Sequence, residues 1–249
     1  MSSIAVSLIV FACLSAGSAL GMLIRKIVPK HHLSSESKTS VQLGMALIST
    51  MSALVLGLLV SSAKSSYDTQ SSELTVTAAN VLQLDSVLAH YGPETKEIRQ
   101  DLRHALQKAV DSLWTQAKDD RLARNSNVSE MIFDKIKDLT PKDENQRNMK
   151  SQSLTILEGV RQMRWLQYEQ LSNSVPVPLL IILVSWLTML FVGIGLFAPA
   201  NATVIVSLAL SEMAVSAAIL LIFEFYSPFG GLIKVSSAPL RAALAQLGH

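Results

Sequence analysis

One side of an apolar stretch near the N-terminus carries small, mildly polar side chains at helical spacing. They recur three or four residues apart, so an α-helix places all of them on one face: Ala46, Thr50, Ala53, Gly57, Ser61 and Lys64. The opposite side is expected to hold the larger Val55, Leu58 and Leu59. Small faces let helices pack closely in lipid. Such a face also suits the lining of an ion pathway, with Lys64 as a positive ring at one mouth.

A single acidic residue interrupts the last apolar stretch. Glu212 lies in the middle of residues 204–223, and no other apolar stretch holds a basic residue that would pair with it. An ionisable residue within a membrane span is costly and suggests a function by default. We expect its carboxyl group to be protonated, hydrogen-bonded to a serine or facing water. One hypothesis is a carrier that uses Glu212 as a proton site.

Other residues that bear chemistry form no recognisable site. His31, His32 and Glu36 lie close together in the sequence, but adjacent histidines point in different directions and no further strong ligand stands at zinc spacing. His90 and His104 are expected at the surface. The sequence contains no glycine-rich phosphate loop and no nucleophile elbow. We therefore expect no enzyme, no metal site and no cofactor.

The distribution of hydrophobic and charged residues predicts the architecture. The chain is 49% hydrophobic and 16% charged, with a mean hydropathy of +0.36, and most charged residues lie between Lys64 and Ser174. Four stretches are long and apolar enough to cross a bilayer, which takes about 20 helical residues; they cover residues 4–24, 41–63, 177–197 and 204–223. Net charge +2 gives no argument for nucleic acid, and the single Cys13 excludes an internal disulfide.

These observations predict an all-α membrane protein with four domains or segments. Residues 1–63 form a first transmembrane hairpin, and residues 64–174 form a helical soluble insert. Residues 175–226 form a second hairpin, in which Asn201 caps the last span. Residues 227–249 form a C-terminal tail with a short helix.

The second span shows no sign of ending at the membrane surface. Neither glycine nor proline occurs from Leu58 to Tyr91, and an apolar stripe continues at helical spacing: Leu74, Ala78, Val81, Leu84, Leu88 and Tyr91. Residues 41–91 therefore predict one helix of about 75 Å, of which the bilayer core takes about 30 Å. The next helix is expected to bury Ile98, Leu102, Ala105, Ala109 and Leu113, and Thr140 is expected to cap the helix that returns to the membrane.

Several stretches resemble the bacterial bestrophin-like domain family. They are "VPKHHLSSESK", "LGMALISTMSALVLGLLVSSAKSSYDTQSSEL", "VLAHYGPE", "LFAPANATV" and "PFGGLIKVSSAPLRAALAQL". The resemblance implies a distant kinship with bestrophins, pentameric anion channels with four spans per subunit and a helical cytosolic part. In "EFYSPFGG", the residues Glu224, Pro228, Phe229 and Gly230 look like the Asn-Pro-Phe-Gly stretch after the last bestrophin span.

The sequence also departs from the bestrophin pattern. No acidic residues follow the "PFGG" stretch, where "GLIKVSS" stands, so no calcium clasp is expected. The phenylalanine neck of bestrophin pores is also missing from the second span, which holds methionine, leucine and small residues.

Orientation receives opposite indications. The resemblance implies a multi-pass protein of the bacterial inner membrane with both termini and the insert in the cytoplasm, and this is the orientation we expect. The positive-inside rule favours the reverse, because the loop Arg25–Lys38 holds four basic residues and nothing basic precedes the first span.

Three functions remain open on the sequence. The first is a homo-oligomeric, pentameric, anion-favouring ion channel lined by the second span, with membrane lipids and inorganic ions such as chloride as partners and no nucleic acid. The second is a non-conducting membrane protein whose helical insert docks a partner. The third is the carrier that uses Glu212.

Overall fold

The chain divides into two compact units, which are described separately. The computed structural model describes residues 2–29, 35–113, 123–172, 176–199 and 201–247. The membrane unit covers Met1–Ser66 and Ser174–Tyr226, and the soluble unit covers Tyr67–Asn173 and Ser227–His249. No strand occurs in the described residues.

The membrane unit is built from four helices. They are α1 (Ser3–Ile27), the first part of α2 (Ser35–Tyr91), α6 (Val177–Phe197) and α7 (Ala202–Phe225). All four are long and apolar enough to cross a bilayer, which confirms the four predicted spans. The Ser2 and Asn201 side chains accept hydrogen bonds from the first-turn amides of α1 and α7, so the predicted Asn201 cap is confirmed.

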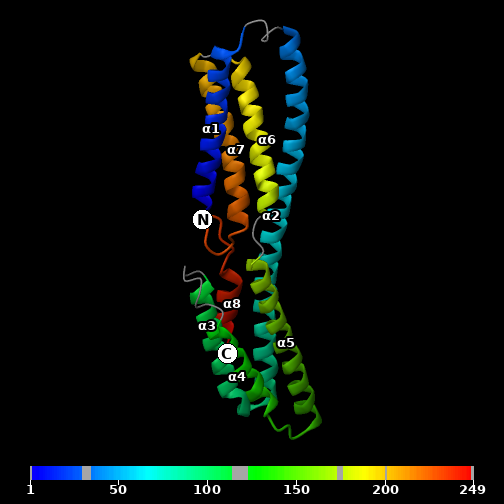
Figure 1. Cartoon of the computed structure of the whole chain (residues 1–249). Coiled ribbons are helices and arrows are strands. Elements are labelled where there is room, and N and C mark those ends of the chain that lie inside the picture. Colours follow the sequence, from blue (N-terminus) through cyan, green and yellow to red (C-terminus); the bar gives the residue numbers. More distant parts are fainter. Residues whose placement is uncertain (1, 30–34, 114–122, 173–175, 200, 248–249) are drawn as a thin grey trace. The chain divides into compact units, whose positions relative to one another are not determined.

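Helix α1 packs along α6 and α7 (Figure 1). Glycines allow its close approach to α6, because a Cβ on Gly21 would overlap the carbonyl oxygen of Val192 and a Cβ on Gly195 would overlap that of Ser18. Small residues at a contact let helix backbones approach in lipid, where the hydrophobic effect does not drive them together. The apolar core of this unit gathers buried residues of all four helices, including Leu14, Leu59, Leu183 and Ile219.

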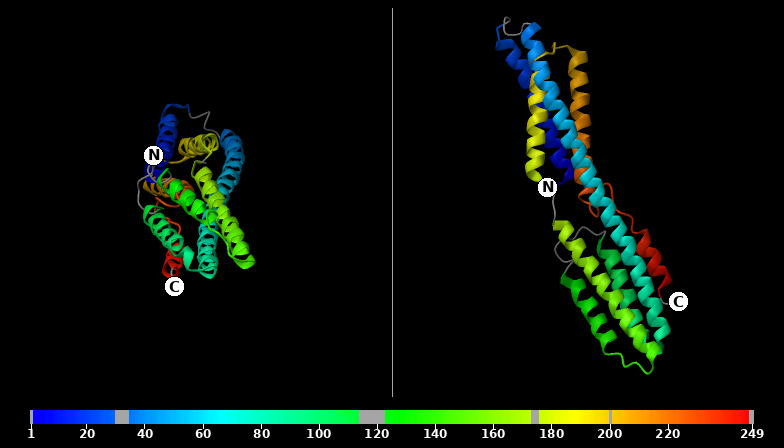
Figure 2. Two further views of the ribbon diagram at one scale, coloured as in Figure 1. Left: turned by 90° about the horizontal axis from the view of Figure 1, so that it is seen from below. Right: turned by 90° about the vertical axis from the view of Figure 1, so that its right-hand side faces the viewer.

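The soluble unit contains the second part of α2 and five further helical segments. They are η2 (Pro93–Thr95), α3 (Lys96–Leu113), α4 (Ala123–Lys137), α5 (Glu144–Ser172) and α8 (Ala238–Gln246). In this unit α5 runs antiparallel to α2, α4 lies against both α3 and α5, and α8 lies against α3 (Figure 2). All six residues of the stripe predicted on α2, Leu74 to Tyr91, are buried in its core, so that prediction is confirmed.

Gly92 makes the reversal between α2 and α3 possible. Its φ of 139° lies in a region that side chains with a Cβ rarely adopt. Thr95 is fully buried beside it, and its hydroxyl bonds to the carbonyl oxygens of Leu88 at 2.5 Å and Gly92 at 2.8 Å. The side-chain amide of Gln146 donates to the Tyr91 carbonyl at 2.9 Å, so α5 also holds this turn.

Two local predictions in the soluble unit are wrong. Helix α5 begins at Glu144 and is capped by Asp143, whose Oδ1 accepts from the Gln146 amide at 2.7 Å, while Thr140 lies before the helix. In α3 the predicted Ile98 and Leu102 are buried, but the stripe continues through Leu106 and Val110, while Ala105 and Ala109 are only half-buried. The side chain of Leu113 lies outside those that the structure describes.

The C-terminal tail contributes to the core of the soluble unit. Val235, Leu240, Ala243 and Leu247 are all buried in the same cluster as the α2 stripe. Helix α8 therefore provides an apolar face that closes the core beside α3.

Helix α2 is continuous over 57 residues, from Ser35 to Tyr91. At 1.5 Å per residue this corresponds to about 85 Å. The predicted continuation of the second span into a long stalk helix is confirmed. The same helix therefore supplies side chains to the cores of both units.

Candidate functional site

The small residues of the second span share one exposed face of α2. Each of the six is exposed in the subunit: Ala46, Thr50, Ala53, Gly57, Ser61 and Lys64. No atom lies within 4 Å of a Cβ built on Gly57. The Thr50 hydroxyl bonds to the Ala46 carbonyl of its own helix at 3.0 Å, which leaves its methyl group and the small neighbours as the surface.

The opposite face of α2 packs into the membrane unit. Ser52, Leu59 and Ala63 are 2% exposed or less, and Met45 fills the space beside Gly193 of α6. Val55 is half-buried, as expected for this side. Leu58, expected on the same side, is 63% exposed and does not take part in this packed face.

A second exposed stripe of α2 is large and apolar. It consists of Leu43, Leu47, Met51, Leu54 and Leu58, which are 44% to 70% exposed. Only 11% of the most apolar 18-residue stretch of α2 is buried, against 28% for the corresponding stretches of α1 and α7 and 33% for that of α6. Helix α2 is therefore the least covered of the four spans in the described chain, with a small face beside an apolar one.

Glu212 is buried between α7 and α1. It is 3% exposed, and each carboxyl oxygen accepts a 2.6 Å hydrogen bond from a hydroxyl of α1: Oε2 from Ser15 and Oε1 from Ser18. The sequence left open whether this carboxyl group is protonated, hydrogen-bonded to a serine or facing water, and the structure shows the hydrogen bonds to serine. The two hydroxyls partly replace the water that the carboxyl group loses on burial.

The two α1 serines that bond to Glu212 were not predicted from the sequence. Ser15 and Ser18 stand three residues apart and so share a face of α1, beside the closely packed Gly17 and Gly21. Another hydroxyl, on Ser7, donates to the Ser216 carbonyl of α7 at 2.9 Å. A row of serines on the face of a span that also carries small residues is the signal that would have identified the partners of Glu212.

The stretch after the last span forms a compact turn. The Gly230 and Gly231 amides donate to the Ser227 carbonyl, both at 3.2 Å, and the Val235 amide donates to the Pro228 carbonyl at 2.8 Å. Pro228 and Phe229 are buried, Phe229 in the core of the soluble unit, and Gly230 is exposed. Glu224 is 4% exposed on the last turn of α7. The motif therefore acts locally as a structured exit from α7, with Phe229 as its apolar anchor.

Ion pairs organise the polar surface of the soluble unit. Asp85 of α2 is buried and accepts two hydrogen bonds from Arg99 of α3, at 2.7 and 2.9 Å. This contact with Asp85 raises the pKa of Arg99. Lys135 of α4 bonds to Asp101 and Glu97 of α3, both at 2.6 Å, which raises the pKa of Lys135. These pairs were not predicted from the sequence.

The described residues contain no group of three or more His, Cys, Asp or Glu side chains able to hold a metal ion. His31 and His32 lie outside the described residues. His90 and His104 are exposed, and the Nδ1 atom of His90 lies 2.7 Å from the Ser86 carbonyl oxygen.

The fold and the site together define a class: an all-α membrane protein with four spans, whose second span continues into a helical soluble unit. The bestrophin-like domain family matches residues 11–240. The chain belongs to this family, as the sequence resemblance predicted.

Solved structures with the same fold are also membrane proteins. A crystal structure of a membrane protein with a proline-to-alanine substitution matches with a TM-score of 0.63 at 14% identity, over 96% of this chain and 97% of that one. A crystal structure of a membrane protein with a leucine-to-alanine substitution matches with a TM-score of 0.55 at 17% identity, over 92% and 94%. No curated protein matches the sequence.

Proposed function

We propose that the protein is a homo-oligomeric, pentameric ion channel that favours anions, with its pore lined by the small face of α2. The observation that carries this proposal is the position of all six small-face residues on the exposed side of the least covered span. Kinship of the bestrophin-like family with bestrophins supports the pentamer and the conduction of anions such as chloride. The bacterial inner membrane, with a cytoplasmic insert and termini, is part of the same proposal.

The small face suits a pore because its side chains are small and mildly polar. Ala46, Ala53 and Gly57 leave room for an ion beside the helix axis. Ser61 and Lys64 place a hydroxyl and a positive charge at the end of the span, where a ring of such groups attracts anions. The adjacent stripe that contains Leu47 and Leu54 is apolar enough to contact lipid or a neighbouring copy.

The experiment is current measurement on the purified full chain in planar bilayers. Gly57→Leu has room in the isolated subunit, since nothing lies within 4 Å of its Cβ position. In a ring of α2 helices it places five leucine side chains in the pore and sharply lowers the current. Gly44→Leu is the matched control, because that position is equally open but lies off the small face.

Ion preference tests the role of Lys64. Lys64→Glu is expected to shift the reversal potential in a chloride gradient towards cation preference. Lys26→Glu makes the same change of charge on α1, away from α2, and is expected to leave the reversal potential unchanged. Wild-type membranes that stay tight to ions, or equal effects of Gly57→Leu and Gly44→Leu, would overturn the proposed pore.

A carrier that uses Glu212 is the second candidate, because a buried intramembrane acid indicates a function by default. Its serine contacts also have a purely structural explanation, the fastening of α1 to α7. The carrier requires that Glu212→Gln abolishes proton-coupled uptake into vesicles. Uptake that is insensitive to Glu212→Gln removes this candidate.

A further inference from the structure

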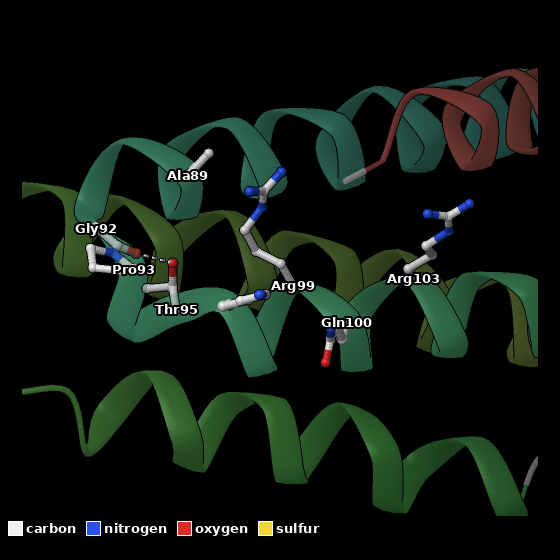
Figure 3. A pocket seen from close by; sticks show the side chains of 8 residues that line it. Ala89, Gly92, Pro93, Thr95, Arg99, Gln100 and Arg103 are labelled. Carbon is white, nitrogen blue, oxygen red and sulfur yellow. Dashed lines mark hydrogen bonds between the residues drawn. The ribbon is translucent and has the colours of Figure 1, made fainter. Parts of the chain in front are cut away.

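An open groove lies where α2 turns into α3. Its volume is about 430 Å³, and it is lined by Ala89, Gly92, Pro93, Thr95, Lys96, Arg99, Gln100 and Arg103. Figure 3 shows the guanidinium groups of Arg99 and Arg103 extending to the same side of α3. The lining contains three cationic side chains and a side-chain amide, and no acidic one.

The charges of α3 are separated by face. Its acidic residues Glu97 and Asp101 both bond to Lys135 of α4. Its basic residues Lys96, Arg99 and Arg103 recur at spacings of three and four, which places them together on the groove side. These two acids of α3 are thus engaged with α4. The charge of Arg99 is balanced by Asp85 of α2, so the net positive charge of the groove comes from Lys96 and Arg103.

Arg99 is held in a fixed position at the groove. Its Nε and Nη2 atoms donate to the buried Asp85 carboxylate, a two-point contact that fixes the plane of the guanidinium. Glu94, which lies in η2 just before α3, is paired with Lys142, and this contact lowers the pKa of Glu94. It therefore remains ionised but carries a counter-charge of its own.

Lys96 and Arg103 complete the groove as available cations. Both side chains are exposed, and neither forms a salt bridge with any acidic group in the part of the chain that the structure describes. They stand two turns apart on α3, about 10 Å along the helix axis. Two such cations flanking a fixed arginine match a ligand with more than one negative charge.

We propose that this groove binds a small, soluble, phosphate-bearing molecule through Lys96, Arg99 and Arg103. Planar guanidinium groups bind phosphate oxygens in pairs, and lysine adds a point charge. The volume falls within the range of small-ligand sites, about 300–1,000 Å³, and is too small to enclose a protein domain. This proposal concerns binding alone and stands whether or not α2 lines a pore.

A membrane lipid is a poorer source of the phosphate than a soluble compound. Every residue that lines the groove belongs to the soluble unit, and none belongs to an apolar stretch long enough to cross a bilayer. The ligand is therefore expected to reach the groove from water.

The test is calorimetric titration of the full chain in detergent with sodium pyrophosphate at constant ionic strength. Lys96→Gln/Arg103→Gln is expected to weaken binding about tenfold or more, because it removes two charge-assisted contacts. Lys108→Gln/Lys137→Gln removes the same charge from exposed positions of α3 and α4 outside the groove and is expected to keep wild-type affinity. The four substituted residues are exposed, so both double variants should fold. Lys96→Arg keeps the positive charge and should also keep binding.

Four results would overturn the proposal. Absence of pyrophosphate binding to the wild-type protein at about 1 mM would show that the groove is not a phosphate site. Equal weakening in the two double variants would show general attraction of anions to a basic surface. Binding of an oligo-glutamate peptide without binding of pyrophosphate would assign the groove to an acidic protein segment, and binding only to vesicles that contain phosphatidic acid would assign it to a lipid.

Discussion

At the residue scale, Glu212 is the most informative side chain of the membrane unit. Its position in a span was evident from the sequence, because one acidic residue interrupts an apolar stretch. Its partners were not, since Ser15 and Ser18 lie 197 and 194 residues earlier in the chain. Serine is common in membrane helices as a small packing residue, so only the approach of α1 to α7 reveals which serines face the carboxyl group.

The Glu212 cluster predicts a non-additive pattern of stability. Ser15→Ala/Ser18→Ala leaves the carboxyl group buried without its two donors and should cost about 1–3 kcal/mol. Adding Glu212→Leu removes the group that needs the donors and should recover most of this loss. Thermal unfolding in detergent measures both. A triple variant less stable than the serine double variant would contradict this explanation.

Tyr91 gives a prediction about pH. Its ring is buried and its hydroxyl has no hydrogen-bond partner in the described part of the chain. Burial raises the pKa of Tyr91, and the nearby Glu94 charge acts in the same direction. Because the folded-state pKa lies above the unfolded value of about 10, this stabilisation is complete below pH ~10 and is lost as the pH rises through the folded value.

Tyr91→Phe removes the unpaired hydroxyl and, with it, the loss of stability caused by ionisation of that hydroxyl at high pH. We expect the variant to be more stable by about 1 kcal/mol at neutral pH and to lose less stability above pH ~10. Tyr67→Phe is the matched control, because its hydroxyl donates to the Lys234 carbonyl at 3.3 Å and its removal should not stabilise. Denaturation curves at neutral pH and above pH ~10 measure the stability of both variants. A destabilised Tyr91→Phe would show that the hydroxyl has a partner.

At the element scale, hydrophobic spacing was the strongest signal. The α2 stripe is a run of apolar residues in a polar surrounding, so its period was clear and all of its members are buried. The α3 stripe was ambiguous because leucine, valine and alanine alternate on adjoining faces. The larger Leu106 and Val110 occupy the core, since larger apolar side chains gain more from burial than alanine.

Helix starts were predictable only where one capping residue stood alone. Asn201 precedes α7 without a competitor and caps it. Before α5, "TPKD" offers both Thr140 and Asp143, and both residues are favoured caps. The structure selects Asp143, whose side chain reaches the Gln146 amide, while Gln146 also bonds to the Lys142 amide at 2.8 Å.

The contact between α1 and α6 predicts different effects for two glycines. Gly21→Ala places a methyl group on the Val192 carbonyl and should separate the helices at a cost of about 1–3 kcal/mol. Gly57→Ala meets nothing in the subunit and should instead stabilise α2 by about 0.5–1 kcal/mol through helix propensity. Thermal unfolding compares them. Equal destabilisation would show that Gly57 also has a neighbour beyond the described residues of its own chain, such as a second copy.

At the scale of the whole molecule, the sequence predicted the number of spans and the continuity of α2, because hydropathy and the absence of glycine and proline determine both. The assembly of copies leaves no such local mark. What a single chain carries is an exposed small face and an exposed apolar stripe on one helix, and both are typical of lipid contact as well as of a subunit interface. Family membership supports the pentamer, and a measurement of mass decides it.

Native mass spectrometry of the detergent-solubilised particle provides that measurement. A pentamer has five times the 27.0 kDa mass of one chain. The Gly57→Leu variant should retain the same stoichiometry if its effect is to narrow a pore and not to disrupt assembly. A monomeric wild-type particle would remove the proposed channel, since a pore between subunits requires a ring.

The unbroken backbone of α2 also bears on how deeply the protein sits in different lipids. Helix α2 is continuous through Ser61, Lys64 and beyond, so no break in the backbone marks where it leaves the bilayer. Its immersion is therefore set by solvation of side chains: a shift by one turn moves the rod about 5.4 Å and draws Lys64 towards hydrocarbon. We expect the immersion of α2 to differ between bilayers of longer and shorter acyl chains, because its apolar stretch has to match the thickness of the hydrocarbon.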